Sequence, residues 1–286
     1  MDRMPSWLRQ EIPGQASRTV SLQLERFGVD TVCRQARCPN INSCFKNGEL
    51  TYMILGSSCT RSCRFCNVRH ARPPDTDFSG EPERIARSAF ALGLRYAVVT
   101  SVTRDDLPDG GSRQFARTIA ALGAADIRIK TEVLIPDFQG SPASLRDVVC
   151  ALPDVTAHNL ETVRRLYPSI KPDSGYDVSL GVLRTIKKIQ PGMLTKSSLL
   201  LGLGETEEDV AAALADLKEA GCDIVVMGQY LAPSAGHHPV EKFLRPEEFL
   251  RYGARARELG FRAVLSEPLA RSSYRAHQLY LQALEN

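Results

Sequence analysis

The chain changes at residue 51 from an irregular pattern to an alternation of short apolar runs and longer amphipathic stretches. Runs rich in β-branched residues are typical of buried strands, whereas apolar residues three and four apart are typical of helices. The runs predict strands at Thr51–Leu55, Tyr96–Val102, Ile127–Ile135, Val155–His158, Ser197–Leu203, Ile224–Gln229 and Ala263–Ser266. The amphipathic stretches predict helices at Ser17–Phe27, Glu83–Leu92, Ser112–Ala121, Ser144–Leu152, Gly175–Ile189, Glu207–Ala220 and Pro246–Leu259.

Strand–helix alternation is typical of a parallel sheet whose strands are joined by helical crossovers. About six units, short of the eight of a closed barrel, predict the α/β class and a partial (β/α)6-type TIM barrel. We expect the barrel at residues 51–266, between an N-terminal extension at 1–50 and a C-terminal segment at 267–286. Active sites of such barrels lie at the C-terminal ends of the strands. Polar clusters follow the predicted strands at Ser57–Cys66, Thr103–Gly111, Asn159–Thr162, Gly204-Glu205 and Pro233–His238.

The amino-acid composition and the net charge exclude some classes of protein. Of 286 residues, 43% are hydrophobic and 24% are charged, which is usual for a soluble globular protein. The net charge of +3 is too small to indicate a nucleic-acid partner. The first residues contain no apolar signal-peptide core, and no later apolar run reaches the length of a membrane span. We therefore expect a cytoplasmic protein with reduced thiols and no membrane or nucleic-acid partner.

Six of the eight cysteines lie within residues 33–66 as two triads. The first is Cys33, Cys38 and Cys44, spaced C-x₄-C-x₅-C, and the second is Cys59, Cys63 and Cys66, spaced C-x₃-C-x₂-C. Thiolates at short spacing are the usual ligands of iron–sulfur clusters. Because a triad supplies three sulfurs to a cluster of four irons, one iron of each cluster is open to another ligand. Disulfides are disfavoured by the reducing compartment and by the close spacing.

Other interpretations of these residues exist. The second triad with His70 or Cys44 could form a zinc site, although zinc loops more often contain paired C-x₂-C units. The remaining cysteines, Cys150 and Cys222, are expected to be core residues. Adjacent His237 and His238 resemble a metal-ligand pair, but neighbouring side chains point apart, so a loop at the barrel mouth is favoured. The segment Gly202–Glu205 lacks the third glycine of a dinucleotide-binding loop.

The second triad, placed after the first barrel strand with Phe65 before its last cysteine, resembles the radical S-adenosylmethionine (SAM) enzymes. The resemblance implies a [4Fe-4S] cluster whose open iron binds the amino and carboxylate groups of SAM. It further implies that an electron from this cluster cleaves SAM to methionine and a 5′-deoxyadenosyl radical.

The two triads together resemble the lipoyl synthase family, and the likeness extends over nearly the whole chain. The matching segments are Arg37–Asn40, Gly56–Cys66, Ser101–Gly111, Glu132–Gly140, His158–Tyr167, Lys196–Thr206, Gly228–Val240 and Arg271–Tyr274. The resemblance implies that the first triad holds an auxiliary [4Fe-4S] cluster with Ser273 of the RSSY segment as its fourth protein ligand. Taken alone, Ser272 and Ser273 would be interpreted as the cap of a following helix. In place of the family's histidine after this motif, the chain has Arg275.

The resemblance also implies the reaction, a radical sulfurtransferase step of lipoate biosynthesis. An octanoyl group on a lysine of a carrier domain loses hydrogen at carbons 6 and 8 to two deoxyadenosyl radicals. Each carbon then takes a sulfur from the auxiliary cluster. The implied partners are acyltransferase subunits of dehydrogenases, the glycine cleavage H protein, and an electron donor such as ferredoxin or flavodoxin.

Residues near the predicted strand ends are candidates for contacts with SAM. Asp109, Gly110 and Gly111 could let the backbone approach its methionyl end, or could form only a tight turn before a helix. Glu132, Asn159, Glu161 and Lys196 are candidates for hydrogen bonds to SAM, although Glu161 is equally suited to the first turn of a helix. Two further hypotheses remain: a related radical sulfur-inserting enzyme, or a non-enzymatic electron carrier or zinc module.

Overall fold

The computed structural model describes residues 4–9 and 15–286, so residues 1–3 and 10–14 of the predicted N-terminal extension lie outside the described part. This extension contains short elements rather than a domain of its own. They are η1 (Ser6–Leu8), α1 (Gln15–Phe27), β1 (Asp30–Thr31), α2 (Val32–Gln35) and α3 (Ile41–Lys46). The strand β1 pairs antiparallel with the first barrel strand, so the extension is attached to one edge of the sheet.

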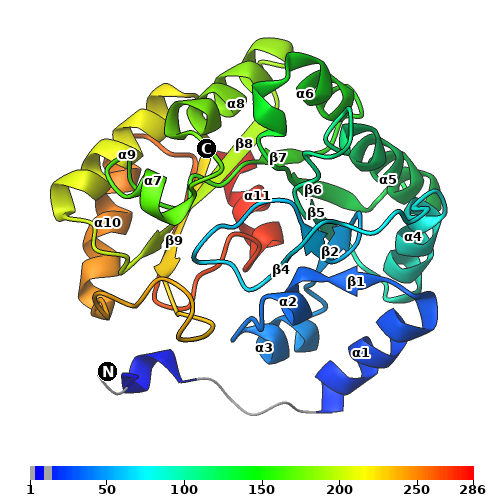
Figure 1. Ribbon diagram of the computed structural model, residues 1–286, viewed down its shortest axis with the longest axis horizontal. Helices are drawn as coiled ribbons and strands as arrows, with labels where there is room; N and C mark the ends of the chain where they lie inside the picture. Colours follow the sequence, from blue (N-terminus) through cyan, green and yellow to red (C-terminus); the bar gives the residue numbers. More distant parts are fainter. Residues whose placement is uncertain (1–3, 10–14) are drawn as a thin grey trace.

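The sheet contains seven parallel strands in chain order, and it curves into a partial barrel (Figure 1). They are β2 (Thr51–Ile54), β5 (Tyr96–Ser101), β6 (Lys130–Leu134), β7 (Val155–Ala157), β8 (Leu194–Leu201), β9 (Ile224–Gln229) and β10 (Ala263–Ser266). Because β1 and β10 are the two edges and do not pair, the barrel is open on one side. The predicted α/β class and partial barrel are confirmed.

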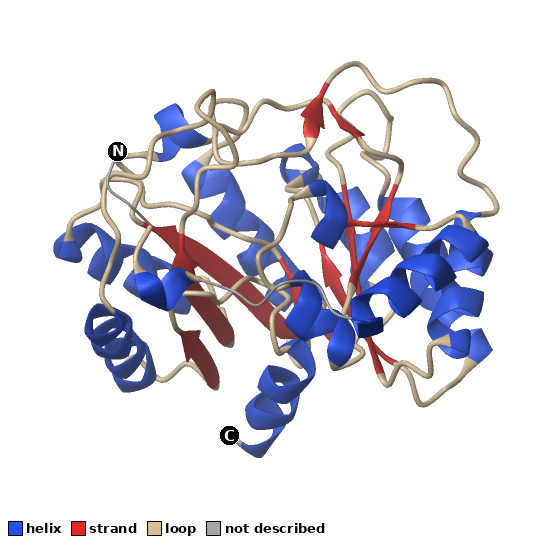
Figure 2. Ribbon diagram, turned by 90° about the horizontal axis from the view of Figure 1, so that it is seen from below, coloured by secondary structure: helices blue, strands red, loops and turns tan. Residues whose placement is uncertain are grey.

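Helices cover the outer face of this sheet, as Figures 1 and 2 show. After the strands come α4 (Glu81–Ala91), α5 (Ser112–Ala125), η2 (Phe138–Gly140), α6 (Pro142–Val149), α7 (Tyr167–Ile170), α8 (Tyr176–Ile189), α9 (Glu207–Glu219) and α10 (Pro246–Glu258). Their apolar faces form two large buried clusters against the strands. Within the described ranges, no helix is long and apolar enough to cross a membrane.

The last helix, α11 (Ala276–Glu285), lies inside the ring of strands in Figure 1 rather than on its outer face. Leu279, Tyr280 and Ala283 pack against residues at the N-terminal ends of the strands, including Tyr96 and Ile224. Because α11 fills this end of the barrel, the space at the C-terminal ends of the strands is a cavity with a floor.

Five of the seven predicted strands end one or two residues earlier than predicted, and two of these five also begin at a different residue. Residues 127–129 form a turn, in which Ile127 is 87% exposed, and β6 begins only at Lys130. The strand predicted to begin at Ser197 begins at Leu194, because Leu194 pairs with Val155 of the neighbouring strand. Pairing between distant strands, which a local pattern does not contain, decides both boundaries.

Gly228 in β9 is held against the segment that follows β10. A Cβ atom at this position would meet the carbonyl oxygen of Ala270 at 2.0 Å. We expect Gly228→Ala to lower the free energy of unfolding by about 1–3 kcal/mol, because the clash is with backbone.

Gly181, inside α8, has no atom within 4 Å of its added Cβ. We expect Gly181→Ala to raise stability by about 0.5–1 kcal/mol. Urea unfolding followed by circular dichroism measures both, and equal effects would contradict the account.

Candidate functional site

A cavity of about 560 Å³ opens at the C-terminal ends of the barrel strands. Five of the six clustered cysteines line it: Cys33, Cys38, Cys59, Cys63 and Cys66. Segments after β5, β6, β7 and β9 complete its wall, whereas the predicted pair Gly204-Glu205 does not line it. The two triads, which are separate in sequence, therefore face one shared space.

The first triad is built on two short helices beside β1 and β2. Cys33 lies on α2, whose start is capped by the Thr31 hydroxyl accepting from Arg34 N at 3.4 Å. Cys38 follows in a turn where Cys38 N donates to Cys33 O at 3.0 Å. Cys44 lies on α3. These three cysteines line a second small pocket of about 20 Å³ next to the cavity.

The C-terminal segment supplies the remaining wall of this small pocket. Ser273 lines both the small pocket and the main cavity. The segment is docked by Asn40 Nδ2, which donates to Leu269 O at 2.6 Å, and by Gln229 N, which donates to Pro268 O at 3.0 Å. The helix α11 begins at Ala276 without a side-chain cap, so the interpretation of the two serines as a helix cap is wrong. Ser273 instead lies beside the first triad.

The loop of the second triad follows β2 and is fixed by backbone contacts on several sides. Its strand β3 (Ser58–Cys59) pairs with β4 (Arg69–His70). Ala71 N donates to Cys59 O at 3.2 Å, and Arg64 N donates to Ile170 O at 2.9 Å. Of the two candidate zinc ligands, His70 contacts Arg61 O through its Nδ1, and Cys44 lies with the first triad. Within the described ranges, no group of three or more His, Cys, Asp or Glu side chains is arranged to hold a single metal ion.

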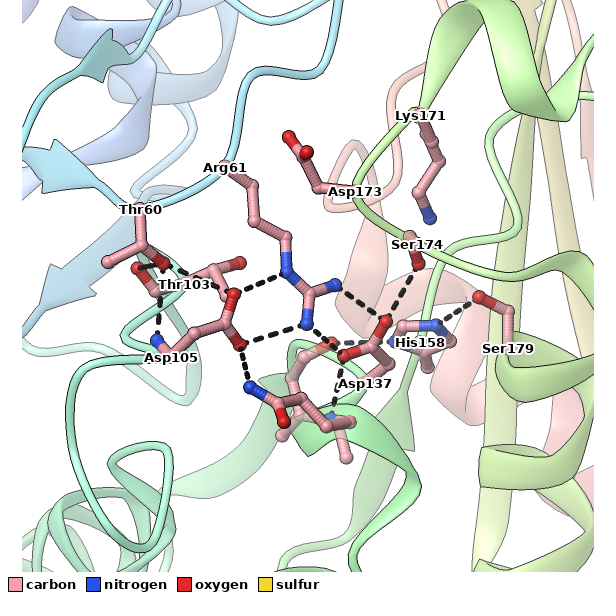
Figure 3. Close-up of polar contacts among 12 residues, drawn as sticks. Thr60, Arg61, Thr103, Asp105, Asp137, His158, Lys171, Asp173, Ser174 and Ser179 are labelled. Carbon is pink, nitrogen blue, oxygen red and sulfur yellow. Dashed lines mark hydrogen bonds and ion pairs between the residues drawn. The ribbon is translucent and has the colours of Figure 1, made fainter.

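Arg61, between the first two cysteines of this loop, is bound by two carboxylates at once (Figure 3). Its Nε and Nη2 donate to Asp105 at 2.7 and 2.9 Å, and its Nη1 and Nη2 donate to Asp137 at 2.6 and 2.7 Å. Burial alone would raise the pKa of Asp137, but the bonds and charge of Arg61 hold it well below its ordinary value. Since Asp105 follows β5 and Asp137 follows β6, this contact ties the cysteine loop to two strand ends.

Desolvation opposes the ionisation of four of the thiols, two in each triad. Burial raises the pKa of Cys33 and Cys63 to about 11 and that of Cys66 to about 12. The pKa of Cys44 is also well above its ordinary value, for the same reason. Thiols bind metal as thiolates, so cationic iron must replace these protons on binding. Two sets of soft sulfur donors that line neighbouring pockets fit two iron–sulfur clusters.

Polar side chains link the first triad's side of the cavity to the second triad's side. Ser272 Oγ donates to Asn159 Oδ1 at 2.9 Å, and Asn159 Nδ2 donates to Glu161 Oε1 at 2.9 Å. Lys171 Nζ donates to Asn159 O at 3.2 Å and interacts electrostatically with Cys63. Burial raises the pKa of Glu161. The side chain before Ser273 is therefore in direct contact with the strand end that faces the second triad.

The seven predicted SAM contacts divide into those that line the cavity and those that do not. Asn159 and Glu161 line it. Asp109 accepts from Gly111 N at 2.9 Å, and a Cβ on Gly111 would meet Leu55 at 2.2 Å, so this turn serves the start of α5. Gly110 is similarly packed against Phe138. None of these three turn residues lines the cavity.

Glu132 and Lys196 are buried below the cavity rather than in its wall. Lys196 Nζ lies 2.8 Å from Glu132 Oε1, and their side chains are 0% and 1% exposed. Tyr96 Oη also donates to Glu132, at 2.9 Å. Each lies third in its strand, so it points into the barrel interior instead of standing at the strand end.

Several residues that line the cavity were not among the predicted candidates: Arg61, Asp137, His158, Lys171 and Arg271. Four lie within segments already singled out for the family likeness, namely Gly56–Cys66 for Arg61, Glu132–Gly140 for Asp137, His158–Tyr167 for His158 and Arg271–Tyr274 for Arg271. Burial lowers the pKa of His158 to about 4, so it is neutral. Lys171 follows the short helix α7, and no local pattern indicates its position in the cavity wall.

The two cysteines outside the triads and the adjacent histidines His237 and His238 differ in their surroundings. Cys222 is buried, as predicted, but Cys150 is exposed and its prediction is wrong, because it caps α6 at the surface. None of the eight cysteines, all within the described ranges, forms a disulfide. His237 Nε2 contacts Cys66 O at 3.1 Å, and His238 N donates to Arg64 O at 2.9 Å. This loop at the mouth therefore packs on the second-triad loop.

Comparison with known sequences gives one consistent result. Residues 53–217 match the family model of the radical SAM superfamily. The chain is 47% identical to the lipoyl synthase of Thermus thermophilus, covering 98% of this chain and 88% of that protein. It is 49% identical to the lipoyl synthase of Geobacter sulfurreducens, covering 96% and 90% of the two chains.

Comparison with solved structures gives the same fold at low sequence identity. The Streptococcus suis SuiB structure bound to S-adenosylmethionine has a TM-score of 0.58 at 12% identity. The match covers 84% of this chain and 51% of that one, so the chain spans about half of SuiB. Methylornithine synthase has a TM-score of 0.56 at 15% identity, covering 93% and 80% of the two chains. These similarities show the partial barrel fold alone.

Substitutions in the buried pair of Lys196 and Glu132 test whether Lys196 stabilises the barrel interior or contacts SAM. Lys196→Met leaves a buried carboxylate without its cation, which we expect to cost about 3–5 kcal/mol of unfolding free energy. Adding Glu132→Gln should recover more than half of this loss. The exposed pair of Lys130 and Asp154 is the control, and Lys130→Met should cost at most about 1 kcal/mol. Urea unfolding measures all of them. Unchanged stability together with weakened SAM binding would instead place Lys196 in the SAM site.

Proposed function

The chain belongs to the lipoyl synthase family of radical SAM enzymes, and from this premise we propose which of its residues serve each half of the reaction. The family's activity is a sulfurtransferase reaction that converts a protein-bound octanoyl group to the lipoyl cofactor with SAM and [4Fe-4S] clusters. The observation that carries the assignment is the shared cavity, because cysteines of both triads and Ser273 line it.

We assign the two clusters to different parts of the chain. Cys59, Cys63 and Cys66 hold the cluster that binds SAM, and residues 51–266 form its barrel. Cys33, Cys38 and Cys44 from residues 1–50 hold the auxiliary cluster, together with Ser273 from residues 267–286. When bound, the first of these clusters supplies the electron that cleaves SAM, and the auxiliary cluster supplies sulfur. A serine oxygen is a hard ligand at an otherwise soft site, which suits a position that must be vacated.

The chain's own residues hold these groups in place and exclude water. Arg61, bound by Asp105 and Asp137, fixes the loop of the second triad relative to the barrel. The floor made by α11 leaves the mouth as the way in. Hydrogen abstraction from an unactivated methylene needs a dry site in which the reacting atoms are aligned. A cavity of about 560 Å³ is within the range that holds a small ligand.

For SAM we propose direct contacts from Asn159 and Glu161, which line the cavity on the side of the second triad. Asp109, Gly110 and Gly111 do not contact SAM and instead fix the turn before α5. Glu132 and Lys196 likewise support the site indirectly, by fixing the strands below the cavity. We assign direct contacts to the side chains that line the cavity and supporting roles to those that do not.

The substrate is an octanoyl group on a lipoyl-carrier protein. We propose that acyltransferase subunits of dehydrogenases and the glycine cleavage H protein serve as carriers, with ferredoxin or flavodoxin as electron donor. An acyl-lysine arm is narrow enough to enter a mouth that a folded carrier domain cannot enter.

Anaerobic reconstitution tests the assignment of the clusters. We expect about eight iron atoms per chain, because two cubane clusters hold four each. Cys38→Ala should retain dithionite-dependent formation of 5′-deoxyadenosine but yield no lipoyl product on an octanoylated carrier. Cys59→Ala should lose both, because it removes a ligand of the SAM-binding cluster.

Cys150→Ala is the matched control, since this exposed cysteine lies outside both triads. It should keep full iron content and both activities. Iron content is measured by colorimetric assay, and the two products by mass spectrometry. Loss of 5′-deoxyadenosine formation in Cys38→Ala would contradict the division of roles, as would zinc in place of iron in either triad.

A further inference from the structure

The arginine of the RSSY segment, Arg271, is a half-buried cation that faces two neighbouring pockets. It lines both the main cavity and the small pocket of the first triad. Cys38 and Glu161 are close enough to interact electrostatically with its guanidinium. Arg271 therefore lies between the residues that we assign to the two clusters.

Most of the hydrogen-bonding capacity of Arg271 is unused within the described part of the chain. A guanidinium has five N–H donors, and the bond seen here is from Nη1 to Ala270 O at 2.7 Å, its own neighbour. Arg61 in the same cavity is different, because two carboxylates take its donors. Glu49 also lines the small pocket, but it forms no ion pair with Arg271, and its Oε2 has no hydrogen-bond partner. Because Arg271 faces both pockets and its other donors are unused, its site is suited to an additional anion.

The backbone holds Arg271 where it is. Gly228 of β9 lies directly under this segment, and a Cβ there would meet Ala270 O at 2.0 Å and Arg271 Nη1 at 3.3 Å. On the other side, Ser272 is fixed to Asn159. With both neighbours fixed, the backbone of Arg271 is held beside the two pockets that the residue lines.

We propose that Arg271 donates hydrogen bonds to the anionic auxiliary cluster and thereby sets its reduction potential and its retention of iron. This inference rests on the proposed assignment of Cys33, Cys38, Cys44 and Ser273 to that cluster. A cubane cluster with three thiolates and a serine oxygen is negatively charged, and hydrogen bonds and nearby cations favour its more reduced, more negative state. Arg271 is in this sense a positioning and tuning residue rather than a ligand.

The test uses a full-length parent in which Cys59, Cys63 and Cys66 are alanine, so that only the first triad can hold a cluster. In this parent we compare Arg271→Met and Arg271→Lys. The readouts are the midpoint potential of the cluster, from an anaerobic redox titration, and the rate at which iron is lost to a chelator. Arg271→Met should shift the potential to a more negative value and accelerate iron loss several-fold. Arg271→Lys, which keeps the charge but not the planar fork, should fall between it and the parent.

Lys171→Met in the same parent is the matched control, because it also removes a cation from the cavity wall but on the side of Cys63. It should leave the auxiliary potential near that of the parent. Equal potentials and equal iron loss in Arg271→Met and the parent would overturn the proposal, as would an equal shift in Lys171→Met. A methionine variant that folds by circular dichroism but takes up less iron than the lysine variant supports it. Misfolding of both Arg271 variants would make the residue structural and overturn it.

The same experiment separates this inference from the proposed function. If the parent with three alanines takes up no iron, the ligand assignment of the first triad fails. If it takes up about four irons per chain and Arg271→Met behaves as the parent does, only the role of Arg271 fails.

Discussion

Contact between the two ends of the chain decides what this cavity can contain. The first triad precedes the barrel and Ser273 follows it, yet both line one small pocket. The hydrogen bond from Asn40 to Leu269 joins residues that are 229 positions apart. This contact is available because the barrel is open between β1 and β10, and both terminal segments come together beside that opening.

The charged residues of the cavity follow from the same arrangement. A loop that carries three thiols cannot be held by those thiols before iron is bound, so other contacts must fix it. Arg61 does this through two carboxylates from neighbouring strand ends. Arg271, on the C-terminal segment, forms no ion pair with a carboxylate of the described residues. Arg61 therefore stabilises the protein around the cavity, whereas Arg271 has donors free for a group bound inside it. The link from Ser272 through Asn159 to Glu161 then connects the two sides.

The sequence pattern predicted the architecture and the thiol ligands but not the supporting residues. Buried parallel strands are apolar along their length, so the runs at Tyr96 and Ile224 were visible without tertiary information. The triads were visible because cysteines are rare and their spacing is short. Lys171 and Asp137 could not be identified, since their roles depend on which strand ends meet. Glu132 and Lys196 were predicted at or near strand ends, but both lie within strands and pair with each other in the interior. For Lys196 the reason is the pairing of β8 with β7, which extends the strand to Leu194.

The central claim is that the two triads hold chemically different groups, one retained and one used as the source of sulfur. The most direct test is to reconstitute the protein with ³⁴S-labelled sulfide, remove the excess, and treat it with SAM, a reductant and an octanoylated carrier protein for a single turnover. Mass spectrometry of the carrier then shows the origin of the sulfur. The account predicts that both sulfurs of the lipoyl product carry the label, and that Cys38→Ala yields no labelled product. A lipoyl product with unlabelled sulfur would contradict it.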